Sequence, residues 1–399
     1  MTQTRTPPAI AASWSLDPDI AHLNHGSFGA CPRVVLEEQA RLRTRIEAEP
    51  VRFFVEDIER ELDKAKASLG QFIGAAPEDL AFVANATSGV NTVLRSLDLG
   101  PNDELLVTDH EYNACRNALD FVAARAGAAV VVAHVPFPLS SPEEVVEAIL
   151  AKVTDRTRLA LVDHITSATG IVMPIEEIVS RLRERGVDTL VDGAHCPGQL
   201  NLNLDELGAA YYSGNCHKWL CTPKGSAVLY VREDRQERIR PLAISHGANS
   251  PRHDRSRFRI EADWTGTHDP TPVLCIPAAI EAMGALYPGG WGELRERNRA
   301  LALEGRAALL SALGQEAPCP DEMISHLAAV ILPEDTTPHA GPYEDPLQVA
   351  LVTEHSVQVP VMRWAPLRAR YLRISAQAYN SIEQYEHLAR ALTALGLGA

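Results

Sequence analysis

The sequence predicts an α/β protein with a mainly parallel sheet flanked by helices, followed by a smaller α+β unit. Short apolar runs alternate with helix-like segments between about residues 80 and 231. These runs are continuous, as expected of strands that are covered by helices on both faces. Polar clusters follow the runs, at the strand ends where parallel sheets bind their ligands.

The expected elements alternate in order along this region. Ile58, Leu62 and Leu69 recur at helical spacing, and Pro142 suits the first turn of a helix. The expected strands cover residues 80–83, 105–108, 129–133, 159–162, 189–191, 209–212 and 227–231. The expected helices cover residues 32–49, 54–72, 87–97, 113–124, 175–185 and a segment that begins at residue 142.

The pattern differs on either side of this region. Residues 24–29 form a glycine-punctuated turn, and residues 232–269 are weakly periodic, which predicts long surface loops. Beyond them we expect helices over residues 272–286, 294–313, 347–355 and 382–395, with strands at 327–332 and 371–374. We therefore expect a large α/β domain over residues 15–270 and a small α+β domain over residues 271–399, together with residues 1–14.

Composition limits the partners and the compartment. The 37 basic and 52 acidic side chains give a net charge of −15, which argues against nucleic acid or an anionic membrane as the main partner. Seven cysteines without CxxC pairs predict reduced thiols. Residues 1–13 lack the apolar core of a signal peptide, and no run approaches the roughly 18 apolar residues of a membrane helix. We expect a cytoplasmic protein.

Lys218 is the residue in the polar clusters with the most specific chemistry. It follows an apolar run and lies among small polar residues, which suits an amine that forms a Schiff base with an aldehyde. A lone lysine at a strand end is more often an ordinary surface residue. The clusters are Thr87-Ser88, His110 to Asn113, Ser167, Asp192 to His195 and Ser213 to Lys218.

Other cluster residues fit the same chemistry. Asp192 can keep a pyridine nitrogen protonated, or it can simply cap a turn. His195 can orient the phenolic side of the ring, or it can be a satisfied core histidine. Thr87 and Ser88 open a helix and suit a phosphate, or they can be an ordinary helix cap.

Two residues could contact the substrate or the ring directly. Tyr112 could stack on a flat ring or shuttle a proton, or it could be a packing residue. Arg373 alternates with apolar residues in a strand, where its fork would bind a carboxylate or form a structural ion pair.

The chain resembles the fold-type I, class V aminotransferase superfamily of pyridoxal-phosphate (PLP) enzymes, and within it the isopenicillin N epimerase group. The resemblance implies PLP as cofactor, a seven-stranded-type sheet, a small-molecule amino-acid substrate and a homodimer with shared active sites. It rests on Asn24-His25-Gly26-Ser27-Phe28-Gly29, Asp109-His110-Glu111-Tyr112-Asn113, Asp192-Gly193-Ala194-His195, Asn215-Cys216-His217-Lys218-Trp219 and Arg373-Ile374-Ser375-Ala376-Gln377-Ala378-Tyr379-Asn380.

The resemblance also implies a role for each matching residue. Lys218 would carry PLP, Asp192 would pair with the pyridinium nitrogen, and Tyr112 would stack on the ring. Arg373 would bind the substrate α-carboxylate. The PLP phosphate would be held by Thr87, Ser88, His217 and Ser213, and Thr267 would contact the phosphate of the neighbouring subunit. Asn24 and His25 would line the substrate entrance. Ser167 lies where relatives have an asparagine near the ring hydroxyl.

Several reactions share the first step, in which Lys218 removes the α-proton of the substrate. An epimerase then returns a proton to the opposite face, for which Tyr112, His25 and His217 are possible acids. A β-lyase acting on a cysteine or cysteine sulfoxide conjugate would instead expel a sulfur leaving group. We expect the epimerase, because the resemblance is closest there, and keep the C–S lyase as the alternative.

Other functions fit the sequence less well. Cysteine desulfurases of similar fold carry a nucleophilic cysteine on a mobile loop before the final arginine. No cysteine follows Cys319 in this chain, so that nucleophile is missing. A non-catalytic PLP-fold binding protein is disfavoured by the presence of Lys218, Asp192 and Arg373. No metal site is expected, because the histidines and cysteines near Lys218 match no zinc spacing. Arginines within residues 244–259 indicate either an anionic substrate tail or a solvated loop.

Overall fold

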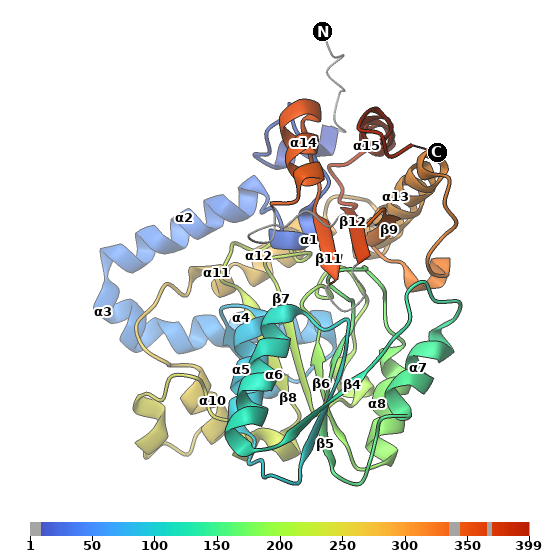
Figure 1. Cartoon of the computed structure of the whole chain (residues 1–399). Helices are drawn as coiled ribbons and strands as arrows, with labels where there is room; N and C mark the ends of the chain where they lie inside the picture. Colours follow the sequence, from blue (N-terminus) through green and yellow to red (C-terminus); the bar gives the residue numbers. More distant parts are fainter. Residues whose placement is uncertain (1–8, 335–343, 365–368, 399) are drawn as a thin grey trace.

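The computed structural model describes residues 9–334, 344–364 and 369–398 (Figure 1). Its larger sheet has seven strands in the order β2-β8-β7-β6-β5-β3-β4. The strands are β2 (Leu80–Val83), β3 (Glu104–Thr108), β4 (Ala129–Ala133), β5 (Thr157–Asp163), β6 (Asp188–Asp192), β7 (Tyr211–Asn215) and β8 (Ala227–Val231). Strand β8 is antiparallel to both its neighbours, and the pairs from β7 to β4 are parallel. The predicted mainly parallel sheet is confirmed.

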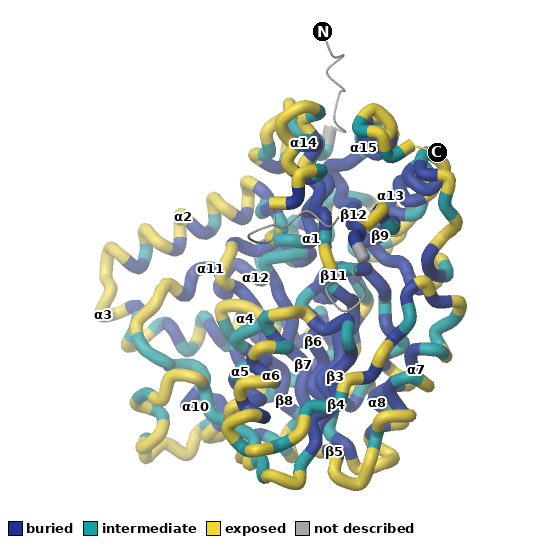
Figure 2. Tube along the Cα trace, in the orientation of Figure 1, coloured by how far each residue is buried: buried dark blue, intermediate teal, exposed yellow. Residues whose placement is uncertain are grey.

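Helices cover both faces of this sheet. Successive side chains of a strand point to opposite faces, so a continuous apolar strand has apolar side chains to bury on each face. Leu105 and Val107 pack with buried residues of α5 and α6, whereas Leu106 packs with residues of α4, α7 and α8. Figure 2 shows the central strands buried beneath the exposed outer sides of the helices. These helices are α4 (Ile58–Ile73), α5 (Ala86–Ser96), α6 (Asn113–Ala126), α7 (Pro142–Leu150) and α8 (Ile175–Glu184).

A second sheet of three antiparallel strands, ordered β11-β12-β9, carries the C-terminal helices. Near the N-terminus, β1 (Ala21–His22) pairs with β10 (Val357–Gln358), and the rings of Trp14 and Tyr379 lie 5.2 Å apart. The N-terminal segment therefore packs against the C-terminal part of the chain. The other elements here are β9 (Leu327–Leu332), β11 (Val361–Trp364), β12 (Ala369–Ser375), α13 (Gly290–Leu313), α14 (Pro346–His355), α15 (Ile382–Ala394) and η1 (Ala9–Ser13). The domain boundary near residue 270 stays a prediction.

Four segments differ from the expected secondary structure. The turn at residues 24–29 contains a one-turn helix, which is too short to give a periodic pattern. The helix expected over residues 272–286 is divided, because Pro277 has no N–H to continue the hydrogen bonds. The helix expected from residue 54 starts with a π-helical turn, and the loops after residue 232 include a short helix.

The helices of these segments and the helices not yet named are α1 (His25–Phe28), α2 (Arg33–Ala48), α3 (Pro50–Arg52), η2 (Phe53–Asp57), η3 (Pro77–Asp79), α9 (Leu204–Leu207), η4 (Glu233–Arg238), η5 (His246–Asn249), α10 (Arg257–Ala262), α11 (Thr271–Leu274), α12 (Ile276–Gly284) and η6 (Asp321–Met323). Among all helices in the described residues, none has both the length and the apolarity needed to cross a membrane.

A buried ion pair joins α4 to the segment after α10. Lys66 has a fully buried side chain and donates to Asp263, which also accepts a 3.1 Å hydrogen bond from Arg259. Burial lowers the pKa of Lys66 to about 8, and the carboxylate of Asp263 opposes this shift. Without that carboxylate the ammonium group would be left uncompensated in the core.

The two partners of this pair should therefore respond unequally to replacement. Asp263→Leu strands the buried charge of Lys66 and should lower the free energy of unfolding by about 3–5 kcal/mol. Lys66→Met removes that charge at similar volume and should change it by no more than about 1 kcal/mol, since Asp263 keeps Arg259. Urea denaturation measures both values, and equal losses would contradict this account.

Candidate active site

The carboxyl ends of the central strands bring the predicted residues together. Asp192 ends β6, where it pairs in register with Asp163 of β5 and Ser213 of β7. Lys218 lies in the turn that follows β7. Residues 26 positions apart in the sequence therefore lie at the same edge of the sheet.

Lys218 is held in an environment that favours its neutral amine. Its Nζ lies 3.2 Å from Nε2 of His195. Burial and the positive charge of Arg373 lower the pKa of Lys218 to about 7, against the opposing charge of Asp192. A large share of the amine is thus unprotonated near neutral pH, as a nucleophile or a base requires.

The short helix α1 holds the backbone of Lys218. His25 is buried, and its Nε2–H donates to the Lys218 carbonyl at 2.9 Å, while its Nδ1 accepts from the Tyr379 hydroxyl at 2.8 Å. Gly29 has a φ of 69°, and a Cβ there would lie 2.2 Å from the His217 carbonyl. Only glycine allows this close approach. Both ring nitrogens of His25 are engaged, and burial lowers its pKa well below the ordinary value.

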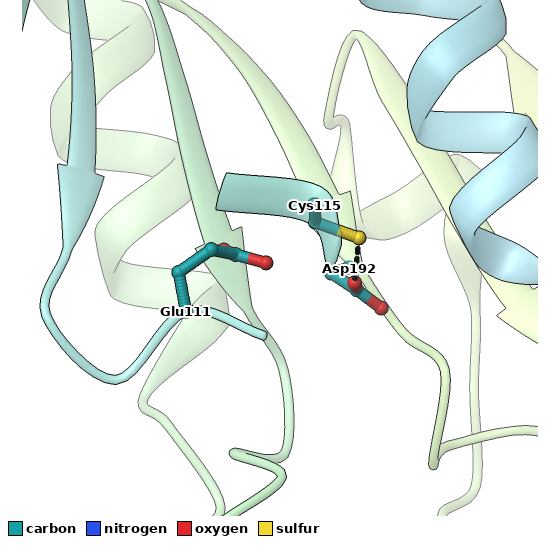
Figure 3. A group of neighbouring side chains, drawn as sticks. All are labelled: Glu111, Cys115 and Asp192. Carbon is teal, nitrogen blue, oxygen red and sulfur yellow. Dashed lines mark hydrogen bonds between the residues drawn. The ribbon is translucent and has the colours of Figure 1, made fainter. Parts of the chain in front are cut away.

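Asp192 and His195 offer two buried polar groups beside Lys218. Oδ1 of Asp192 accepts from the Ala194 N–H at 2.9 Å, and Oδ2 accepts from the Cys115 thiol at 3.1 Å (Figure 3). Burial raises the pKa of Asp192. Burial also lowers the pKa of His195 well below its ordinary value, and its Nδ1 has no hydrogen-bond partner among the described residues.

The start of α5 is built for polar contacts. Asn85 caps it by accepting from the Ser88 N–H at 2.8 Å and from the Ser88 hydroxyl at 3.0 Å. Asn215 accepts from the Ala86 N–H at 2.9 Å. Thr87 and Ser88 are partly exposed at this helix end. Neither Asn85 nor Asn215 is among the predicted cofactor contacts, although an asparagine before a helix is a recognisable cap signal.

Two other predicted phosphate contacts differ in accessibility. His217 is partly exposed, and its Nδ1–H donates to the Ser226 carbonyl at 2.8 Å, which leaves Nε2 as the nitrogen that can face a ligand. Ser213 is fully buried, with its hydroxyl 3.1 Å from the Val228 carbonyl and 3.3 Å from the Ala86 carbonyl. In this structure Ser213 supports the start of α5 from below.

Arg373 links β12 to the α1 segment. Its side chain is buried and donates to the Ser167 carbonyl and, at 3.3 Å, to the Ser27 hydroxyl. Ser27 in turn donates to Asn24 at 2.6 Å. The structure thus brings Arg373, Asn24 and Ser167 together, with the backbone carbonyl of Ser167 rather than its hydroxyl making the contact.

Tyr112 and Thr267 lie on the surface of the chain. Tyr112 precedes α6 and is 46% exposed. Thr267 is exposed in the segment between α10 and α11. Their predicted roles at the ring and at a neighbouring subunit's phosphate stay predictions.

The arginines of the 244–259 segment serve mainly to attach it to α4. Arg252 pairs with Glu59, Arg255 donates to Asp63 at 2.7 Å, and Arg259 donates to Asp63 at 2.6 Å. Carboxylates of the same chain therefore compensate these charges. This favours the structural interpretation of the basic segment over an anionic substrate tail.

The groups beside Lys218 fit PLP as a ligand. A neutral amine suits the aldehyde, the carboxylate of Asp192 suits a pyridinium nitrogen, and the unpartnered Nδ1 of His195 is a buried polar atom that a ligand could satisfy. The exposed polar end of α5 suits a phosphate.

The chain belongs to the class-V aminotransferase family, whose model matches residues 29–388. It is 36% identical to isopenicillin N epimerase of Amycolatopsis lactamdurans, covering 97% of this chain and 99% of that protein. It is 34% identical to isopenicillin N epimerase of Streptomyces clavuligerus, covering 95% and 96%. L-cysteine desulfhydrase of Arabidopsis thaliana is 30% identical, covering 94% and 88%.

Solved structures agree with this fold. The cysteine desulfurase CsdA of Escherichia coli superposes with a TM-score of 0.78 at 20% identity, covering 98% of each chain. The cystine C-S lyase C-DES gives a TM-score of 0.76 at 22% identity, covering 94% of this chain and 97% of the other. The predicted PLP fold type I is confirmed, and PLP is the cofactor of this enzyme.

The lowered pKa of Lys218 can be tested without PLP. In the apoenzyme, the rate at which Lys218 reacts with a small aldehyde and cyanoborohydride should rise with pH and level off above about 7. Arg373→Gln removes a neighbouring positive charge and should move this midpoint upward. Peptide mapping by mass spectrometry gives the rate at Lys218. A midpoint near the roughly 10.4 of an unperturbed lysine would contradict the account.

Proposed function

We propose that this chain is an amino-acid epimerase of the isopenicillin N epimerase type. The proposal rests on the similarity of this chain, over nearly its whole length, to two such epimerases, and on the placement of the Lys218 amine 3.2 Å from His195, where its pKa is lowered to about 7. A base with this pKa can accept the α-proton of an amino acid at neutral pH. Bound PLP supplies an electron sink for the charge left on the α-carbon.

The side chains around Lys218 divide the remaining work. Arg373 binds the substrate carboxylate. Asn24 lies beside this carboxylate site, because it accepts a hydrogen bond from Ser27, which in turn accepts one from Arg373. Asp192 holds the ring nitrogen and His195 the phenolic side. Thr87, Ser88 and the Nε2 of His217 hold the phosphate, with Ser213 beneath them and Ser167 beside Arg373.

Epimerisation also needs an acid on the other face of the substrate, and we assign this role to Tyr112. Tyr112 is 46% exposed, so part of this residue is accessible to substrate and solvent. Both nitrogens of His25 are hydrogen-bonded away from solvent, which favours a positioning role through the Lys218 backbone. Burial lowers the pKa of His217 to about 4, which makes it a poor proton donor at neutral pH.

A PLP-dependent C–S β-lyase is the second candidate, because the chain is also similar to L-cysteine desulfhydrase. Such a lyase needs no cysteine nucleophile. Cys216 and Cys221 near Lys218 are buried, and burial raises the pKa of both thiols. A thiolate at either position is therefore strongly disfavoured, which argues further against a persulfide-forming desulfurase.

We also propose a homodimer in the cytoplasm. Val51 and Val55 are each 76% exposed on the arm formed by α2, α3 and η2, and Thr267 is exposed as well. A second subunit would cover these apolar side chains and receive Thr267 at its phosphate site. Sedimentation of the holoenzyme at one and two chain masses distinguishes the two states.

The reaction is decided by incubation in deuterated water with a panel of L-amino acids and cysteine conjugates. An epimerase should give a racemised product that carries deuterium at the α-carbon, whereas a lyase should give pyruvate and ammonia. Lys218→Ala should abolish both outcomes, because the base is lost. NMR and chiral chromatography follow the products. Absence of any exchange across the panel would instead favour a non-catalytic PLP-binding protein.

The positioning role of His25 gives a separate prediction. His25→Gln keeps a donor for the Lys218 carbonyl and should retain α-proton exchange within about tenfold, whereas His25→Ala should lose more. The pH profile of kcat should keep its shape in His25→Gln. Equal loss in both variants, with the acid limb of that profile gone, would show that His25 is the proton donor.

A further inference from the structure

A second carboxyl group lies behind Asp192. Glu111 lies in the segment before α6, and its side chain points toward Cys115 and Asp192 (Figure 3). One ligand atom from each of these three buried residues lies within 4.8 Å of the others. The mechanism proposed above uses only Asp192 of this group.

Asp163 makes this a cluster of three carboxyl groups. It ends β5 directly beside Asp192 in the sheet register. Oε2 of Glu111 and Oδ2 of Asp163 are fully buried and have no hydrogen-bond partner among the described residues. Within the described residues, Oε1 of Glu111 accepts a single hydrogen bond, from the Tyr112 N–H at 3.2 Å. Two buried oxygens thus lack the donors that ionised carboxylates require.

The charged surroundings do not compensate three negative charges. Arg116 on α6 faces Glu111, and Lys218 faces Asp163 and Asp192. Burial and mutual repulsion raise the pKa of Glu111 and of Asp163 well above the ordinary values, and burial raises that of Asp192. Carboxyl groups that share so small a space cannot all be ionised, so protons are held within the cluster.

A bound cation is a weaker explanation for this cluster. A metal ion would need the thiolate of Cys115, and burial with the neighbouring carboxylates raises the pKa of that thiol well above the ordinary value. The thiol already donates to Asp192 at 3.1 Å. Asp192 is also the residue proposed for the ring nitrogen of PLP, which would compete with any metal.

We propose that Glu111 is a positioning residue of the cofactor site, whose carboxyl group stays protonated at neutral pH and keeps the negative charge of the cluster on Asp192. This inference rests on the proposed pairing of Asp192 with the ring nitrogen. A neutral Glu111 adds no competing charge and offers its O–H as a donor to a carboxylate. The charge that faces the ring then belongs to a single residue.

Infrared difference spectroscopy of the apoenzyme tests the proton directly. At neutral pH the difference spectrum between wild type and Glu111→Gln should contain the C=O stretch of one protonated carboxyl group, because any band from Asp163 is common to both proteins and cancels. The matched control is Glu316→Gln, at an exposed position, which should leave that band unchanged. A difference spectrum without that band would overturn the inference, because Glu111 would then be ionised in the wild type. The isosteric change keeps this test valid even if bulkier variants misfold.

PLP affinity then tests the effect on Asp192. Glu111→Gln keeps a neutral donor and should hold the PLP dissociation constant and the pH midpoint of the bound cofactor's absorbance close to wild type. Glu111→Leu removes the donor and should weaken PLP binding about tenfold. Equal weakening in both variants would overturn the inference, because the protonated form would then have no special role.

A third variant separates this inference from the proposed function. Asp192→Asn should weaken PLP binding, because the amide cannot carry the charge that pairs with the ring nitrogen. Unchanged affinity in Asp192→Asn would contradict the proposed role of Asp192 and, with it, that of Glu111. Weakened affinity in Asp192→Asn, together with no loss of the infrared band in Glu111→Gln, would contradict the inference alone.

Discussion

The site depends on one partly buried amine that lies beside positive charge. Burial and Arg373 both disfavour the ammonium form of Lys218, and Asp192 only partly restores it. An amine in water would be protonated at neutral pH and could neither attack an aldehyde nor accept a proton. The surrounding structure therefore partly shields this amine from water, holds its backbone in place and keeps the weakly basic imidazole of His195 at 3.2 Å from it.

The fold meets these needs with elements from distant parts of the chain. Parallel strands place Asp192 and Lys218 at one edge of the sheet, and β12 of the small sheet brings Arg373 to the same place. Helix α1 fixes the Lys218 carbonyl through His25, and Gly29 lets the two backbones touch. A change in α1 would thus act on the lysine without any contact with substrate.

Much of this arrangement is predictable from sequence, for identifiable reasons. Continuous apolar runs predict the parallel strands, and the rule of strand ends predicts that Asp192 and Lys218 meet. Sequence does not reveal where a side chain points or which of its atoms are already hydrogen-bonded. Both nitrogens of His25 are hydrogen-bonded, the hydroxyl of Ser213 points toward the start of α5, and Glu111 lies close to Asp192. The role of the basic segment near Arg255 is also ambiguous from sequence, because its carboxylate partners lie almost 200 residues away along the chain. Such contacts follow from tertiary packing, which local patterns do not encode.

The most direct test of the central claim is to locate the lysine that carries PLP. The chain has five lysines, Lys64, Lys66, Lys152, Lys218 and Lys224, so reduction of the holoenzyme with borohydride followed by peptide mapping gives an unambiguous position. The account predicts that the reduced cofactor is attached to Lys218. Attachment to Lys224, whose amine donates to the Gly29 carbonyl at 2.9 Å in this structure, or to any other lysine would contradict it.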